Sequence, residues 1–154
     1  MREETKIVHS GLHPERFQGA VNPPVFHAST ILSESVEEYR RKRKDWLQDM
    51  PVTYYGRCGT PTVETLQEAI AALEGGHRTV VYPSGLAACA GALLAFLSSG
   101  DHLLIADSVY GPTRHLTEGI LKRFGVATTF FDPLIGRSIE SMIRPETRVI
   151  YLES

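Results

Sequence analysis

The chain has 154 residues, of which 42% are hydrophobic and 22% are charged, and its formal net charge is -2 at pH 7. These values are typical of one compact soluble domain, and the small negative charge argues against binding nucleic acid or a membrane through bulk charge. No segment has the length and hydrophobicity of a membrane span, and the charged N-terminus is unlike a signal peptide. Two cysteines without a CxxC pair fit a cytoplasmic protein and supply no metal framework.

The first part of the chain, residues 1–34, is expected to be irregular, because prolines and glycines repeatedly interrupt any period. Within it, residues 21–31 (VNPPVFHASTI) are apolar but have no helical pattern. A long irregular apolar segment usually lies across another structure. Here that structure is either the chain's own domain or a neighbouring subunit.

Residues 35–48 are expected to form a helix with Val36, Tyr39, Trp46 and Leu47 on one face. The helix carries a basic run, RRKRK, at residues 40–44. A solvated helix face balanced by nearby acids is the preferred interpretation, and nucleic-acid binding is the alternative.

A polar, glycine-rich loop at residues 51–62 precedes a second predicted helix. Thr60 suits the N-cap and Pro61 the first helical position. Apolar residues then recur at helical spacing until Gly75 ends the helix.

Residues 78–97 (RTVVYPSGLAACAGALLAFL) combine a strand pattern, a turn and a helix pattern. Thr79–Tyr82 is β-branched and aromatic and predicts a buried strand, and the sequence Pro-Ser-Gly at 83–85 breaks it. Residues 86–97 are apolar on every face and predict a buried helix. Backbone N–H groups at such a helix N-terminus suit an anion, most often a phosphate. An ordinary βα turn is the alternative.

Beyond residue 98, strands and helices alternate. Strands are predicted at residues 102–106, 126–131 and 149–152, and helices from Pro112 and over residues 138–143. Repeated βα units predict a parallel sheet covered by helices on both faces. Ligands of such sheets bind at the carboxyl ends of the strands, where the turns at 83–85 and 107–110 are expected to lie.

The common nucleotide and hydrolase motifs are absent. There is no GxGxxG and no GxxxxGK[ST]. Ser84 is not in a G-x-S-x-G turn, because Tyr82 takes the place of the first glycine, so a phosphate-binding or capping role suits Ser84 better than that of a nucleophile. The six histidines have no metal-ligand spacing, so no metal site is expected.

Three features suit one phosphorylated aromatic ligand. The N–H groups of Gly85 and Leu86 can bind a phosphate. Arg57 can add a bidentate contact and Tyr55 a hydroxyl donor, while Tyr110 can stack on an aromatic ring. The spacing is equally compatible with Arg57 as a surface arginine and Tyr110 as a partly buried turn residue.

The chain resembles the N-terminal part of the pyridoxal-phosphate enzymes of Cys/Met metabolism, the family of cystathionine lyases and synthases. Five motifs in family order carry the resemblance: Asn22-Pro23-Pro24-Val25; Tyr55-Gly56-Arg57 with Thr60-Pro61-Thr62; Pro83-Ser84-Gly85-Leu86-Ala87-Ala88; Asp107-Ser108-Val109-Tyr110-Gly111; and Val149-Ile150-Tyr151-Leu152-Glu153-Ser154. Residues 27–30 and the form of residues 55–62 are most similar to bacterial cystathionine β-lyases.

The resemblance implies an α/β fold of the aspartate-aminotransferase-like type (fold type I). Residues 1–60 would be an N-terminal arm for subunit contact, and residues 61–154 the first part of the cofactor domain. The active site would need at least a dimer, and the family forms tetramers.

The resemblance also implies pyridoxal 5'-phosphate as the cofactor and assigns residues to it. Gly85 and Leu86 would bind its phosphate through their amides, and Tyr110 would stack on its pyridine ring. Tyr55 and Arg57 would reach the phosphate in the neighbouring subunit. Tyr110 and Tyr55 are the candidate catalytic residues.

The implied reaction is β-elimination of L-cystathionine to homocysteine, pyruvate and ammonia, a step of methionine biosynthesis. A cystathionine γ-lyase, a γ-synthase or a methionine γ-lyase is the alternative within the family.

The family's Schiff-base lysine has no counterpart in this chain. None of the four lysines, Lys6, Lys42, Lys44 and Lys122, has the matching context. The chain also ends directly after a predicted strand that would normally lead into another crossover. We therefore expect an N-terminal fragment that does not catalyse the reaction by itself. A non-catalytic remnant and a small hydrolase using Ser84 are the other readings.

Overall fold

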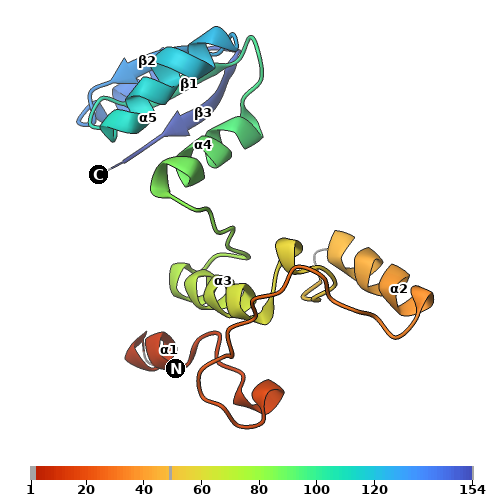
Figure 1. Cartoon of the computed structure of the whole chain (residues 1–154). Coiled ribbons are helices and arrows are strands. Elements are labelled where there is room, and N and C mark those ends of the chain that lie inside the picture. The colour runs from red at the N-terminus through yellow and green to blue at the C-terminus, as the bar shows by residue number, and fades with distance from the viewer. Residues whose placement is uncertain (1–2, 49, 154) are drawn as a thin grey trace. The chain divides into compact units, whose positions relative to one another are not determined.

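The computed structural model describes residues 3–48 and 50–153, and the chain divides into two compact units, residues 1–81 and 82–154 (Figure 1). The first unit contains α1 (Glu3–His9), η1 (Pro14–Phe17), α2 (Val36–Leu47), η2 (Gly56–Cys58) and α3 (Pro61–Glu74). The second contains α4 (Gly85–Phe96), β1 (His102–Ala106), α5 (Gly111–Leu116), η3 (Thr117–Leu121), β2 (Ala127–Phe131), η4 (Gly136–Met142) and β3 (Thr147–Tyr151). The boundary expected from the family resemblance, between an arm of residues 1–60 and a cofactor domain of residues 61–154, stays a prediction.

The N-terminal arm is more regular than its composition predicts. The expectation of an irregular segment over residues 1–34 is wrong for α1 and η1. A helix as short as α1 is marginal alone, but α1 packs against α3. Gly11, with a φ of 76°, then brings the chain against the backbone of Thr65 in α3. Tertiary contact therefore stabilises a helix that the sequence pattern does not reveal.

The two predicted helices of the first unit are confirmed. Ser35 caps α2, because its hydroxyl accepts a 3.1 Å hydrogen bond from the N–H of Glu38. Tyr39 and Trp46 of α2 pack around Tyr54, with ring centroids 6.2 and 5.4 Å away. The basic run is partly paired within α2, by Lys42 with Glu38 and by Arg41 with Asp45.

The helix α3 begins and ends where predicted. Pro61 is its first residue, and Gly75 ends it in the left-handed conformation with a φ of 65°. Thr60 occupies the N-cap position, but its side chain makes no capping hydrogen bond. The backbone geometry of Pro61 and Gly75 is thus sufficient to set the ends of this helix.

The second unit is built on a parallel sheet in the order β2-β1-β3. All five residues of the central strand β1 are buried. The parallel sheet and its three strands confirm the prediction from alternating elements, with small shifts of the strand ends. The predicted helix at 138–143 is a 3₁₀ helix, η4, and the helix from Pro112 runs from α5 into the π-helical turn η3.

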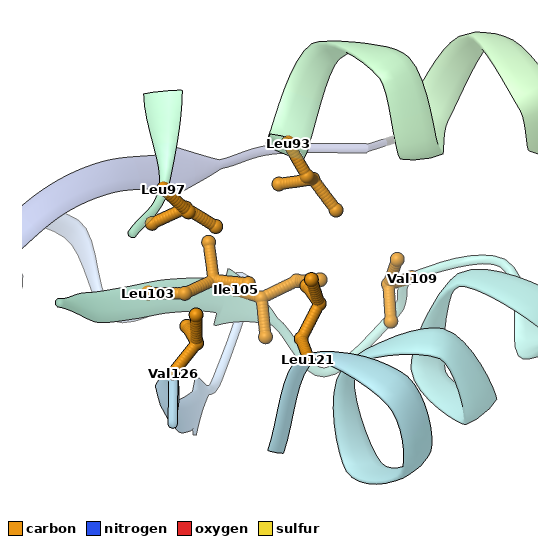
Figure 2. Packing of buried hydrophobic residues seen from close by; sticks show 7 residues of the cluster. All are labelled: Leu93, Leu97, Leu103, Ile105, Val109, Leu121 and Val126. Atoms are coloured by element: carbon orange, nitrogen blue, oxygen red, sulfur yellow. The ribbon is translucent and has the colours of Figure 1, made fainter. Parts of the chain in front are cut away.

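The core of this unit covers both faces of β1. Leu93 of α4 and Leu97, the residue that follows α4, point toward Leu103 and Ile105 on one face, where Leu121 also packs (Figure 2). The alternate residues Leu104 and Ala106 face the other side, where Phe131 and the η4 residues Ile139 and Met142 cover them. Because successive side chains of β1 point to opposite faces of the sheet, β1 contributes to two apolar layers.

Two expectations about residues 79–97 are wrong. Thr79–Tyr82 forms no strand, and Val80 is 67% exposed. A strand requires a hydrogen-bonded neighbour, and β1, β2 and β3 pair with one another instead. The following segment is helical as predicted, but α4 is not buried on every face, since Leu94 and Phe96 are exposed.

Candidate functional site

The N-terminus of α4 presents open backbone N–H groups. Ser84 is the N-cap, and its hydroxyl accepts a 3.2 Å hydrogen bond from the N–H of Ala87. The N–H groups of Gly85 and Leu86, in the first turn, have no partner within the helix. A Cβ atom added to Gly85 would meet no heavy atom within 4 Å, so the space beside Gly85 is open. The capping role expected for Ser84 is confirmed, and the turn suits an anion.

Tyr110 lies at the carboxyl end of β1, where α5 begins. Its side chain is 52% exposed. Its carbonyl oxygen accepts hydrogen bonds from the N–H groups of Thr113 and Arg114, at 2.9 and 3.1 Å. Its own N–H donates to Oε2 of Glu153 at 3.3 Å. Both peptide groups of Tyr110 are therefore held, while about half of its side chain is exposed.

The turn after β1 has a second fixed point at Arg114. The guanidinium of Arg114 donates to the backbone carbonyl of Asp107 at 2.9 Å and forms an ion pair with its carboxylate. The same guanidinium lies 4.0 Å from the ring centroid of Phe130 in β2. Arg114 thus joins the turn, α5 and the neighbouring strand.

Glu153, just beyond β3, connects three elements of the second unit. The hydroxyl of Ser108 donates to its backbone carbonyl at 3.0 Å. The hydroxyl of Tyr151 lies 3.3 Å from both Oε2 of Glu153 and Sγ of Cys89 in α4. Burial, together with hydrogen bonds to Cys89 and Glu153, raises the pKa of Tyr151 above its usual range. The ends of β1 and β3 and the N-terminal half of α4 therefore lie close together.

This connection through Glu153 is absent from the sequence prediction. A signal for it existed, because the carboxyl ends of parallel strands meet at one edge of a sheet. Glu153 follows one predicted strand, and Tyr110 follows another. Polar side chains just beyond two such strand ends are candidates for contact.

A hollow of about 420 Å³ lies at this same edge. It is lined by Ala106 and Ser108 at the end of β1, Pro133 beyond β2, and Leu152 and Glu153 beyond β3. The carboxyl edge of a parallel sheet is where ligands of α/β proteins bind. None of Gly85, Leu86 and Tyr110 lines this hollow, so it is a separate feature from the predicted phosphate and ring contacts.

Tyr55 and Arg57 belong to the first unit, whereas the groups just described belong to the second. The guanidinium carbon of Arg57 lies 5.0 Å from the ring centroid of Tyr55, within cation–π range. A hydrogen bond with Ser29 and the neighbouring guanidinium of Arg57 lower the pKa of the Tyr55 hydroxyl. Because Tyr55 and Gly85 belong to different units, their meeting at one phosphate stays a prediction.

Gly56 lies between Tyr55 and Arg57 in the sequence, and backbone contacts at this turn hold both residues in place. Its N–H donates a 2.7 Å hydrogen bond to the carbonyl of Ser29, and Thr30 pairs with Tyr55 in an antiparallel bridge. Residues 28–30 therefore hold the Tyr-Gly-Arg turn through backbone contacts.

Within residues 3–48 and 50–153, no helix is long and apolar enough to cross a membrane. The same residues contain no group of three or more His, Cys, Asp or Glu side chains that would hold a metal ion. Of the four lysines, only Lys122 belongs to the second unit, and it directly follows η3.

Residues 4–154 match the model of one protein family, described as Cys/Met metabolism PLP-dependent enzymes. The chain belongs to this family. It is 42% identical to a putative cystathionine beta-lyase of Rhizobium johnstonii, over 97% of this chain and 36% of that protein. It is 38% identical to the cystathionine beta-lyase MetC of Escherichia coli, over 98% of this chain and 38% of that protein. The chain thus spans less than two fifths of the length of either relative.

Solved structures give the same family. The chain superimposes on metB from Corynebacterium glutamicum with a TM-score of 0.88 at 27% identity, covering 100% of this chain and 37% of that one. Cystathionine gamma-lyase from Lactobacillus plantarum, complexed with L-serine, gives a TM-score of 0.83 at 31% identity, with the same coverage.

These matches confirm the resemblance and the predicted fold class, an α/β fold of the PLP-dependent fold type I kind. The last residue of the closing motif, Ser154, lies outside the described residues.

Proposed function

We propose that this chain supplies the phosphate-binding and ring-stacking part of a pyridoxal-phosphate-dependent carbon–sulfur lyase. The observation that supports the proposal most directly is the open first turn of α4. Its N–H groups lie in the unit that holds Tyr110, in a chain of a PLP-dependent family. The residues present fit the phosphate group, because Gly85 leaves space for it and Ser84 engages only the N–H of Ala87.

The proposal assigns a task to each of these residues. The N–H groups of Gly85 and Leu86 bind the phosphate at the positive end of α4. Tyr110 covers one face of the pyridine ring, and its exposed side chain is available for that contact. Tyr55 and Arg57 bind the phosphate held by a neighbouring subunit, so the active protein is at least a dimer and, as in the family, a tetramer. Tyr55, whose hydroxyl has a lowered pKa, is a further candidate catalytic residue.

The proposed reaction is β-elimination of L-cystathionine, which with water gives homocysteine, pyruvate and ammonia. The bound cofactor supplies the electron-withdrawing group that labilises bonds at the amino acid's α-carbon. The support for this substrate is similarity to the cystathionine beta-lyases at 38–42% identity. Methionine biosynthesis in the cytoplasm is the corresponding role, and the half-buried free thiols of Cys58 and Cys89 fit a reducing compartment.

Similarity to cystathionine gamma-lyase supports a second candidate, γ-elimination or γ-replacement. A third candidate is a chain that binds the phosphate without turnover. It is supported by the lysine content of residues 82–154, which include one of the four lysines of the sequence, Lys122.

Product analysis separates these candidates. We expect the gene that encodes this chain to restore growth without methionine to a bacterium lacking its own cystathionine β-lyase. We also expect the purified product of the whole gene, supplied with pyridoxal phosphate and cystathionine, to release pyruvate. Release of 2-oxobutyrate would favour the γ-lyase instead. Saturable binding of the cofactor without either keto acid would support the non-catalytic chain.

Binding by the chain itself tests the site directly. Pyridoxamine 5'-phosphate carries the phosphate and the ring but needs no lysine. We expect it to bind the chain saturably and to shift the amide resonances of Gly85 and Leu86. Gly85→Val, which fills the open space, is expected to weaken binding about tenfold or more. A binding curve unchanged by G85V would contradict the assignment.

A further inference from the structure

Tyr110 lacks the packing that normally fixes an aromatic ring. Its side chain is about half exposed, although the preceding residue, Val109, is buried in the core. An exposed ring at a turn samples several rotamers, so the backbone that carries it decides which space it can reach. What holds the backbone of Tyr110 is therefore important for anything that its ring does.

Glu153 makes the bond that fixes the N-terminal side of Tyr110. The N–H of Tyr110 lies at the start of α5, where the first donors of a helix have no internal partner. Oε2 of Glu153 accepts from this N–H at 3.3 Å. A carboxylate acceptor makes such a bond stronger than a neutral one and is favoured at the positive end of the helix.

The position of Glu153 is fixed in turn by two other groups. Its backbone carbonyl accepts a hydrogen bond from Ser108, two residues before Tyr110. Its carboxylate is also within 3.3 Å of the Tyr151 hydroxyl, which lies equally close to Cys89 of α4. The single hydroxyl proton of Tyr151 is thus shared by two acceptors. This places the carboxylate between the turn that carries Tyr110 and the helix that begins at Gly85.

We propose that Glu153 is a positioning residue, whose carboxylate sets the location of Tyr110 relative to the N-terminus of α4. The inference rests on the proposed function, because the ring acts on the cofactor that α4 binds. In this role Glu153 touches neither phosphate nor pyridine ring. It fixes the distance between the two groups that do.

The first measurement needs no ligand. In the wild-type chain, the amide of Tyr110 is expected to exchange slowly with deuterated water, as followed by two-dimensional NMR. Glu153→Ala should speed that exchange about tenfold, because it removes a charged acceptor. Glu153→Gln, which keeps a side-chain carbonyl, should stay within about threefold of wild type. Glu140→Ala, at an exposed glutamate of η4 in the same unit, is the matched control and should leave the Tyr110 amide unchanged.

The second measurement reads the ring. Stacking by Tyr110 should shift the methyl protons of bound pyridoxamine 5'-phosphate upfield through the ring current. In E153A this shift should largely disappear and the affinity should fall about fivefold, whereas E153Q and E140A should retain both. An E153A chain with wild-type amide exchange, methyl shift and affinity would overturn the proposal.

The role of Glu153 can still be tested if the chain binds no ligand or if E153A does not fold. If the chain does not bind pyridoxamine 5'-phosphate at all, the proposed function fails, but the exchange of the Tyr110 amide still decides the role of Glu153. If E153A does not fold, Glu153→Asp replaces it, since its shorter side chain keeps the charge but withdraws the carboxylate. A positioning role then requires faster Tyr110 exchange in E153D than in E153Q, and equal rates would refute it.

Discussion

The backbone N–H of Gly56 donates a 2.7 Å hydrogen bond to the carbonyl oxygen of Ser29. The two segments approach so closely that a Cβ atom on Gly56 would overlap the backbone carbonyl of Ala28. Glycine is needed here for its small size, since its φ is not in the left-handed region. The Tyr-Gly-Arg turn therefore depends on a backbone contact that no other residue permits.

Gly56→Ala is accordingly expected to destabilise the first unit by roughly 1–3 kcal/mol, the usual cost of overpacking. Urea unfolding followed by circular dichroism measures the loss. Gly76→Ala is the matched control, because its Cβ would meet nothing closer than 4.0 Å. Equal stability of the two variants would show that the contact between Gly56 and Ala28 is not tight in solution.

The ionisation of Tyr55 depends on its two neighbours. A hydrogen bond with the Ser29 hydroxyl, at 3.5 Å, is the larger cause of its lowered pKa, and Arg57 is the next. Ser29→Ala should therefore raise the pKa of Tyr55 toward its ordinary value near 10. Arg57→Gln should raise it in the same direction. The Cζ chemical shift of labelled Tyr55, followed through an alkaline titration, measures both, and a pKa unmoved by S29A would contradict the assignment.

His102 makes the stability of the second unit dependent on pH. Its ring is buried between β2 and β3, with Thr129 and Thr147 hydroxyls each 2.8 Å from one ring nitrogen. Burial, and secondarily the charge of Arg144, lower the pKa of His102 below its ordinary value of 6.5. Folding thus favours the neutral ring, and its contribution is complete above pH 6.5 and lost as the pH falls toward the folded-state pKa.

Urea midpoints at pH 7.5 and 5.5 test this sign. The wild-type chain should be less stable at pH 5.5, and His102→Gln, although less stable at pH 7.5, should lose less on acidification. His115→Gln, at an exposed histidine of α5, should behave like wild type. If H102Q and wild type lose the same free energy on acidification, another group is responsible.

Leu103 is the most direct test of the two-layer core. Its side chain is 0% exposed, between α4 and the remainder of that apolar layer. Leu103→Ala should cost about 2–5 kcal/mol of unfolding free energy. Leu134→Ala removes the same atoms from a side chain that is 90% exposed, and should change stability by no more than about 0.5 kcal/mol. Similar costs for both variants would mean that the core is not packed as described.

Local chemistry explains which elements are predictable from the sequence. The ends of α3 follow from Pro61 and Gly75, and β1 follows from the apolar run Leu103–Ala106 between turns. Thr79–Tyr82 has equal strand propensity but no pairing partner, and strand propensity alone forms no strand. The helix α1 is missed for the opposite reason, because its stability comes from α3, which is distant in sequence.

The features of the candidate site differ in the same way: local ones are predictable from the sequence, and contacts between distant residues are not. The N-cap role of Ser84 and the place of Tyr110 after β1 follow from neighbouring residues and are predictable. The bond from Tyr110 to Glu153 joins residues that are 43 positions apart. It depends on the side-chain conformation of Glu153, which the pattern of polar and apolar residues does not predict. The sequence thus indicates the groups that we propose to bind the cofactor, and the structure shows the contact that holds Tyr110.

The order β2-β1-β3 has a consequence for how the protein is made. The strand in the middle of the sheet is the first of the three to leave the ribosome, and its partners follow only after long crossovers. Until then the run Leu103-Leu104-Ile105 has no neighbouring strand, and of the residues that later cover it only those that precede β1, such as Leu93 of α4, have been made. The apolar centre of the sheet therefore stays partly exposed until the later strands arrive, and exposed apolar segments of this kind favour aggregation during folding.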